Sequence, residues 1–138
     1  MSAPSMSMIY LEDMENIALG GAFLGTGGGG DPYIGKLMAR QAIAANGPVE
    51  VIDVETLPDD ALVVPVAMMG APTVMLEKLP QGGEALSALQ SLQNYLGRKA
   101  DAVFCIEAGG LNSTIPIAVA ASAGLPIIDG DGMGRAFP

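Results

Sequence analysis

The spacing of apolar and polar residues predicts two helices in the first third of the chain. Apolar residues recur at helical spacing over 11–22, and acidic residues fall in the first turn, where they complement the helix dipole. This pattern predicts a helix over about 11–23. A second helix is expected to begin near Pro32, with Asp31 as its cap, and to run to Ala45 before Asn46-Gly47-Pro48 end it.

The rest of the chain alternates apolar runs with two more helical patterns. The runs show little of the two-residue alternation of a half-exposed strand, so they predict buried strands. An α/β fold is therefore expected, with a mostly parallel sheet and flanking helices. The predicted strands are Val49–Val54, Ala61–Met69, Ala102–Ile106 and Pro126–Asp129, and the helices are Glu84–Leu96 and a small-residue helix that Asn112 or Ser113 caps and that ends at Ala123.

The composition narrows the chemistry that this fold can carry. The 138 residues include 15 acidic and six basic side chains, giving a net charge of −9, with no His and one Cys. The absence of His excludes a Ser-His-Asp triad and a His-ligated metal, and one Cys excludes an internal disulfide. Six scattered cations argue against a nucleic-acid-binding surface. Carboxylates, hydroxyls, backbone amides, Arg and Lys remain as the groups that can act.

The chain is apolar for a small soluble domain. Half of its residues are hydrophobic and 15% are charged, against about 25% charged in a typical domain. Either the strands are deeply buried, or a homo-oligomer or partner chain covers apolar surface. No membrane span or signal peptide is predicted, and a lone Cys fits the cytoplasm. We expect a disordered tail at 1–9 and one α/β domain over 10–138.

A run of glycines between the two N-terminal helices is the first candidate site. It comprises Gly27, Gly28, Gly29 and Gly30, and with Gly25 it matches G-x-G-x-x-G. Asp53 lies at the end of a predicted strand, as a ribose-binding acid would. That dinucleotide fingerprint should follow a strand, however, and here it follows a helix. The glycine amides are alternatively suited to an anion or oxyanion, or the run is simply a tight loop. Thr26 and Asp31 are the adjacent side chains that could act.

Polar motifs also follow the apolar strand runs, where parallel sheets bind their ligands. Glu107 is a candidate base, metal ligand or cap for loop amides. Asp129 and Asp131 have the oxygen chemistry of a divalent-metal site, or are solvated turn acids. Arg135 is suited to neutralise them or to hold a substrate carboxylate.

Two further residues are open to more than one interpretation. Glu77 either faces the site or forms a surface ion pair with Lys78. Cys105 is interpreted as a small buried hydrophobic residue, because no neighbouring group is placed to lower its pKa.

Four motifs, taken in order, resemble the N-terminal domain of the S-methyl thiohydantoin desulfurase family. Its members were long catalogued as a domain of unknown function and are often found near hydantoinase and oxoprolinase genes. The resemblance extends from about Tyr10 to Pro138. The motifs are Leu24–Pro32, Gly70–Val74 with Glu77-Lys78, Glu107–Ser113, and Leu125-Pro126 with Asp129–Pro138.

The resemblance implies an α/β N-terminal domain that acts on a thiohydantoin- or hydantoin-like ring by hydrolytic loss of sulfur from a ring carbon. We expect Glu107, Asp129 and Asp131 to be catalytic, with Asp129 and Asp131 as the ligands of any divalent metal. The expected substrate-binding residues are Thr26, Gly27, Gly28, Gly29, Gly30, Asp31, Glu77, Asn112 and Arg135.

The same resemblance makes this chain look like one part of a longer protein. Family members continue into a second domain, so the chain is expected to supply half of a site for a small heterocyclic substrate. Two alternatives from other classes stay open. One is a non-catalytic subunit or assembly domain that binds a nucleotide or small anion at the glycine run. The other is a structural oligomerisation domain that binds no ligand.

Overall fold

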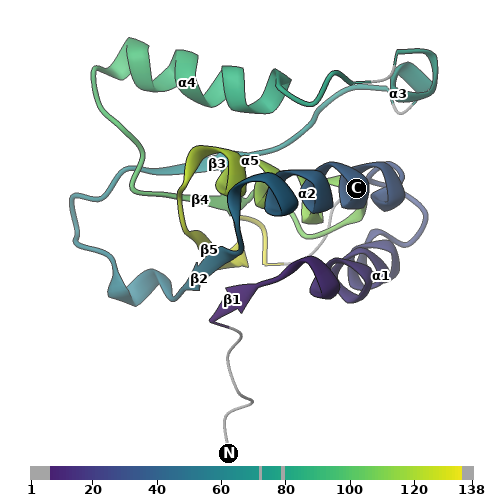
Figure 1. Ribbon diagram of the computed structural model, residues 1–138, viewed down its shortest axis with the longest axis horizontal. Helices are drawn as coiled ribbons and strands as arrows, with labels where there is room; N and C mark the ends of the chain where they lie inside the picture. The colour runs from purple at the N-terminus through teal and green to yellow at the C-terminus, as the bar shows by residue number, and fades with distance from the viewer. Residues whose placement is uncertain (1–6, 72, 79, 135–138) are drawn as a thin grey trace, which may run out of the picture.

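A computed structural model describes residues 7–71, 73–78 and 80–134 and shows an α/β domain built on a five-stranded sheet (Figure 1). The strand order is β1-β2-β5-β4-β3, in which β2, β5, β4 and β3 run parallel and β1 pairs antiparallel with β2. The expected fold class is confirmed. The strands are β1 (Met8–Ile9), β2 (Val49–Ile52), β3 (Val63–Val66), β4 (Ala102–Cys105) and β5 (Ile127–Asp131).

Within the described residues, five α-helices and three short 3-10 turns accompany these strands. The α-helices are α1 (Met14–Gly25), α2 (Pro32–Asn46), α3 (Thr73–Glu77), α4 (Glu84–Leu96) and α5 (Ile115–Ala123), and the turns are η1 (Leu11–Asp13), η2 (Val54–Thr56) and η3 (Gly110–Ser113). None of the helices in the described ranges is long and apolar enough to cross a membrane.

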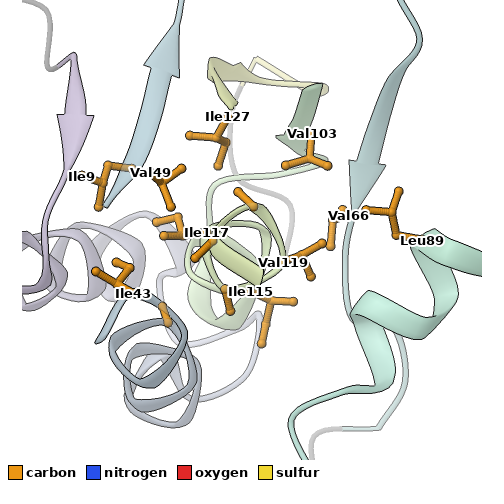
Figure 2. Packing of buried hydrophobic residues seen from close by; sticks show 14 of the residues in the cluster. Ile9, Ile43, Val49, Val66, Leu89, Val103, Ile115, Ile117, Val119 and Ile127 are labelled. Atoms are coloured by element: carbon orange, nitrogen blue, oxygen red, sulfur yellow. The ribbon is translucent and has the colours of Figure 1, made fainter. Parts of the chain in front are cut away.

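Helix α5 lies at the centre of the core (Figure 2). It is apolar all round, and every residue from Ile115 to Ala121 is buried, which is typical of a helix enclosed on all sides. Strand residues such as Val66 and Val103 contact it from the sheet, while Ile43 of α2 lies on its other side. This enclosed helix therefore accounts for part of the high apolar content of the chain.

Glycines let α1 and α2 approach the start of α5 closely. A Cβ atom added to Gly21 of α1 would lie 2.1 Å from Ser113 Oγ, and one added to Gly35 of α2 would lie 2.0 Å from Thr114 Oγ1. Even alanine would collide at these positions. The two helices consequently hold the segment that leads from β4 into α5.

Local patterns predicted several element boundaries correctly. Helix α4 begins at Glu84 and ends at Leu96 as expected, with Gly97 in the left-handed conformation as its C-cap. The Asp31 side chain caps α2 by accepting a 2.8 Å hydrogen bond from the Tyr33 N–H. Helix α1 starts within the predicted range but continues to Gly25.

Other boundaries differ from the prediction for physical reasons. Strand β3 covers only 63–66 of the predicted 61–69, because the Asn112 side chain occupies both backbone groups of Met68. Neither Asn112 nor Ser113 caps α5, whose N-cap is Thr114 without a side-chain cap bond. Strand β2 ends at Ile52, since the Asp53 side chain caps the turn that follows.

The ends of the sheet also differ from expectation. Met8 and Ile9, which were placed in the N-terminal tail, form β1 beside Val49 and Glu50, while residues 1–6 lie outside the described part of the chain. Strand β5 extends to Asp131, which pairs with Cys105 through an irregularity in the β4–β5 register.

Candidate functional site

The carboxyl ends of the parallel strands bring three segments to one edge of the sheet. They are the residues after β3, the loop from Glu107 after β4, and the end of β5 at Asp131. Cys105, the last residue of β4, contacts two of them. Its Sγ hydrogen-bonds to the carbonyls of Glu107 at 2.6 Å and Asn112 at 2.8 Å in the loop after β4, and Cys105 pairs with Asp131 of β5. Glu107 and Asp131, two of the candidate residues predicted from the sequence, therefore share this edge.

A buried polar network centred on Glu107 fixes the loop after β4. The Glu107 side chain is 5% exposed. Its Oε2 accepts a 2.6 Å hydrogen bond from the Gly109 N–H, and its Oε1 accepts a 2.7 Å bond from Asn112 Nδ2. Both carboxylate oxygens are thus engaged. Of the three roles left open for Glu107, this geometry is that of a cap for loop amides.

Asn112 extends the network to the neighbouring strand. Its Oδ1 accepts a 2.7 Å hydrogen bond from the Met68 N–H, and its Nδ2 donates to the Met68 carbonyl at 3.2 Å. One amide side chain therefore continues the backbone pairing of β3 and contacts the Glu107 carboxylate. The loops after β3 and β4 are held as one unit.

The glycine-rich loop between α1 and α2, residues 26–30, packs directly on this unit. The Gly29 carbonyl accepts a 2.8 Å hydrogen bond from the Leu111 N–H. The backbones approach so closely that a Cβ atom on Gly110 would lie 2.3 Å from the Gly29 oxygen. Two motifs that lie some 80 residues apart in the printed sequence thus form one surface.

The conformation of this loop leaves amide groups free for a ligand. Thr26 is left-handed with φ 50°, and Gly27, Gly29 and Gly30 also have positive φ, which glycine adopts without strain. Among the hydrogen bonds of the described residues, none uses the N–H groups of Gly27, Gly29 or Gly30 as donors. Successive free amides in such a loop can bind an anion or a developing negative charge.

The two aspartates of β5 differ in exposure and in bonding. Asp129 is exposed, whereas Asp131 is half-buried and its Oδ1 accepts hydrogen bonds from the Met133 and Gly134 N–H groups. Both lie in β5; Asp129 was predicted to end this strand, whereas Asp131 was expected beyond it. Within the described ranges, no three His, Cys, Asp or Glu side chains are grouped so as to hold a metal ion.

Burial and nearby carboxylates determine the state of the Cys105 thiol. The pKa of Cys105 is raised to about 12. Burial is the main cause, and the negative charges of Glu107 and Asp131 contribute to the same rise. The thiol is therefore protonated at neutral pH and serves as a hydrogen-bond donor. Its prediction as a small buried residue is confirmed.

Comparison with known proteins now identifies the domain. Residues 12–138 match the model of a family described as S-Me-THD-like, N-terminal domain. The chain belongs to this family. The crystal structure of a protein from Chromobacterium violaceum is similar to it, with a TM-score of 0.68 and 33% sequence identity, and the match covers 96% of this chain and 37% of that one. No curated protein gives a significant match.

The remaining predicted residues of the S-Me-THD-like domain fall in different places. Thr26 and Asp31 flank the glycine-rich loop, and both are exposed. Glu77 is exposed on α3, which stands apart from the sheet (Figure 1). Arg135 lies outside the described residues. The structure therefore unites the glycine-rich loop with Glu107 and Asn112, and places Asp131 beside Cys105 on the next strand.

Two contributions to the S-Me-THD-like site were missed because they come from the backbone. The N–H and carbonyl of Met68 hold Asn112, and the Leu111 N–H binds the glycine-rich loop. Side-chain patterns carry no signal for such groups. A polar Asn beside a buried strand end is the one hint that a backbone partner is needed.

Proposed function

We propose that this S-Me-THD-like domain forms one wall of a hydrolase site for a thiohydantoin- or hydantoin-like ring. The observation that carries the proposal is the 2.8 Å contact between Leu111 N–H and Gly29 O, which sets free glycine amides beside the strand-end loops. Ligands of parallel α/β sheets bind at this edge. The family description, S-Me-THD-like, supports the substrate class.

The proposed reaction replaces sulfur by oxygen at a ring carbon. Water adds to the ring carbon that bears the S-alkyl group. A C–O bond forms as the π bond between this carbon and the ring nitrogen breaks and its electron pair moves to that nitrogen, while a base removes one proton from the water. The C–S bond then breaks as the new hydroxyl group loses its proton and becomes the carbonyl oxygen. One of the two water protons goes to the sulfur, which leaves as a thiol, and the other stays on the ring nitrogen. The step needs a positioned base and donors that stabilise the negative charge developing on the ring.

We assign the role of that base to Asp131. Its Oδ1 is held by two backbone amides of the following turn, which orients the carboxylate at the strand end. Glu107, by contrast, is buried with both oxygens engaged, so we assign it the role of positioning the loop. Among the described residues, no third His, Cys, Asp or Glu lies with Asp129 and Asp131 to hold a metal ion, so the proposed reaction includes no step through a metal.

The substrate contacts follow from the same arrangement. The free N–H groups of Gly27, Gly29 and Gly30 meet the developing charge, and Thr26 and Asp31 border them. Arg135, four residues beyond Asp131, would hold an acidic group of the substrate. Because this chain matches 37% of its longer relative, activity of the whole protein would need the remaining part.

The nucleotide alternative has less support in this geometry. A phosphate commonly binds amides at the start of the helix that follows a strand. Here the Leu111 N–H at that position is already occupied by the Gly29 carbonyl. The glycine-rich loop also follows α1, so the strand that a dinucleotide fingerprint requires is not its predecessor.

Isothermal titration calorimetry separates the two functions. The ligands are an S-methylated thiohydantoin, hydantoin, ATP and inorganic phosphate, each added to the 138-residue chain. We expect heat of binding from the ring compounds, and weaker binding in a Gly29→Ala variant. Binding of ATP alone would favour the nucleotide alternative, and an absence of heat from all four ligands would favour a structural domain.

A further inference from the structure

The outer side of the α1–α2 hairpin exposes large apolar side chains. Leu19 and Phe23 of α1 are 71% and 81% exposed, and Tyr33 and Leu37 of α2 are 56% and 47% exposed. We call these four residues the hairpin face. The inward side of each helix is already buried through Met14, Ala18, Gly35, Ala39 and Ile43, so the hairpin face is a second apolar surface that the core does not use.

The four side chains lie on two helices that an ion pair holds side by side. Glu15, Leu19 and Phe23 follow each other at four-residue intervals and so share one row of α1. Glu15 binds Lys36 of α2 at 2.9 Å, which places that row beside α2. Lys36 also lies 4.8 Å above the ring of Tyr33, and Leu37 follows Tyr33 by one turn. The ion pair thus joins the two apolar rows.

We infer that the hairpin face docks against the polypeptide that completes a longer family member. The family is described as an N-terminal domain, and the Chromobacterium violaceum relative has most of its chain outside the match, since 37% of it is covered. A phenylalanine 81% exposed within an apolar row is typical of a surface that a protein partner covers. The expected partner surface is a folded, apolar one, with polar groups around its rim.

The position of the hairpin face connects docking with the candidate site. The glycine-rich loop is the turn of this same hairpin, with Phe23 near the end of α1 and Tyr33 at the start of α2. A domain seated on the hairpin face would border the free glycine amides and close that side of the site. This inference concerns docking alone and holds whatever the substrate is.

Hydroxyl-radical footprinting of two proteins tests the inference. One is the 138-residue chain, and the other is the same chain joined to the part of the Chromobacterium violaceum protein that follows its matching segment. Tyr95 is the internal control, because it is 88% exposed on α4, on the opposite side of the molecule from α1 (Figure 1). We expect oxidation of Phe23 and Tyr33 to fall several-fold on joining, with Tyr95 unchanged.

Three outcomes would overturn the inference. They are equal oxidation of Phe23 in both proteins, protection of Tyr95 in place of Phe23, and a concentration-dependent dimer of the free chain that protects Phe23, which would assign the face to a second copy. If the joined protein does not fold, the natural relative decides. Its residues that superpose on Leu19 and Phe23 must be covered by the rest of its chain, and solvent exposure there would refute the inference. Since the readout is protection, failure here leaves the proposed function standing.

Discussion

The side-chain amide of Asn112 donates a buried 2.7 Å hydrogen bond to the carboxylate of Glu107, between the loops that follow β3 and β4. This pair links the ends of β3 and β4 and supports the surface on which the glycine-rich loop rests. Both oxygens of the Glu107 carboxylate are therefore engaged in holding the loop after β4.

Asn112→Ala is expected to destabilise the domain. It removes the partner of the Met68 N–H and of one Glu107 oxygen, and an unpaired buried polar group costs about 1–3 kcal/mol. Asn46→Ala is the matched control, because Asn46 is exposed and bonds only within its own helix, so its effect should stay within about 0.5 kcal/mol. Urea unfolding measures both variants. Equal losses from the two substitutions would contradict the network.

Neighbouring glycines of α1 should respond to alanine with opposite signs. Gly20 has nothing within 4 Å of an added Cβ atom, so Gly20→Ala should stabilise the helix by about 0.5–1 kcal/mol. Gly21→Ala would place its Cβ atom 2.1 Å from Ser113 Oγ, and such overpacking costs about 1–3 kcal/mol. Thermal unfolding monitored by circular dichroism measures the difference, and a gain for both variants would show that α1 does not pack as described.

The contact between Gly110 and Gly29 can be isolated in a similar way. Gly110 and Gly124 have φ of 58° and 65°, so alanine suffers a similar backbone penalty at each, about 1–2 kcal/mol. Only at Gly110 would the new Cβ atom collide with the glycine-rich loop, 2.3 Å from the Gly29 oxygen. Gly110→Ala should therefore lose clearly more unfolding free energy than Gly124→Ala. Similar losses would mean that the two motifs do not touch.

The thiol of Cys105 gives a prediction for alkaline pH. A thiol ordinarily titrates near 9.0, and burial raises the pKa of Cys105 to about 12. The folded state then holds the proton more tightly than the unfolded state, so this group's stabilising contribution is complete below pH 9 and declines as pH rises towards 12. The unfolding free energy should fall more steeply over this window than in Cys105→Ala. Parallel profiles would refute the buried, charge-flanked thiol.

Local information explains which parts of the fold could be predicted. The ends of α4 and the Asp31 cap depend on nearby residues, and both agree with the sequence pattern. The short β3 could not be foreseen, because Asn112 lies 44 residues from Met68 in the chain. Strand β1 has two residues and α3 has five, so neither is long enough to show a periodicity.

Only part of the candidate site could likewise be predicted from the sequence. Its position at the carboxyl ends of parallel strands follows from the fold class alone. That the glycine-rich loop reaches this edge depends on the fit of Gly29 against Gly110, which no spacing in the sequence reveals. The role of Glu107 among its alternatives likewise depends on the direction in which Asn112 points.

Mapping a bound ring compound onto the chain tests the central claim most directly. The measurement is a titration of the isotopically labelled 138-residue protein with an S-methylated thiohydantoin, followed by amide chemical shifts in NMR. We expect saturable shifts concentrated at Gly27–Gly30, Glu107–Ser113 and Asp131–Gly134, with the amides around Gly97 unchanged. Shifts confined to residues away from these three segments, or no saturable shifts at millimolar ligand while ATP perturbs the glycine-rich loop, would contradict it.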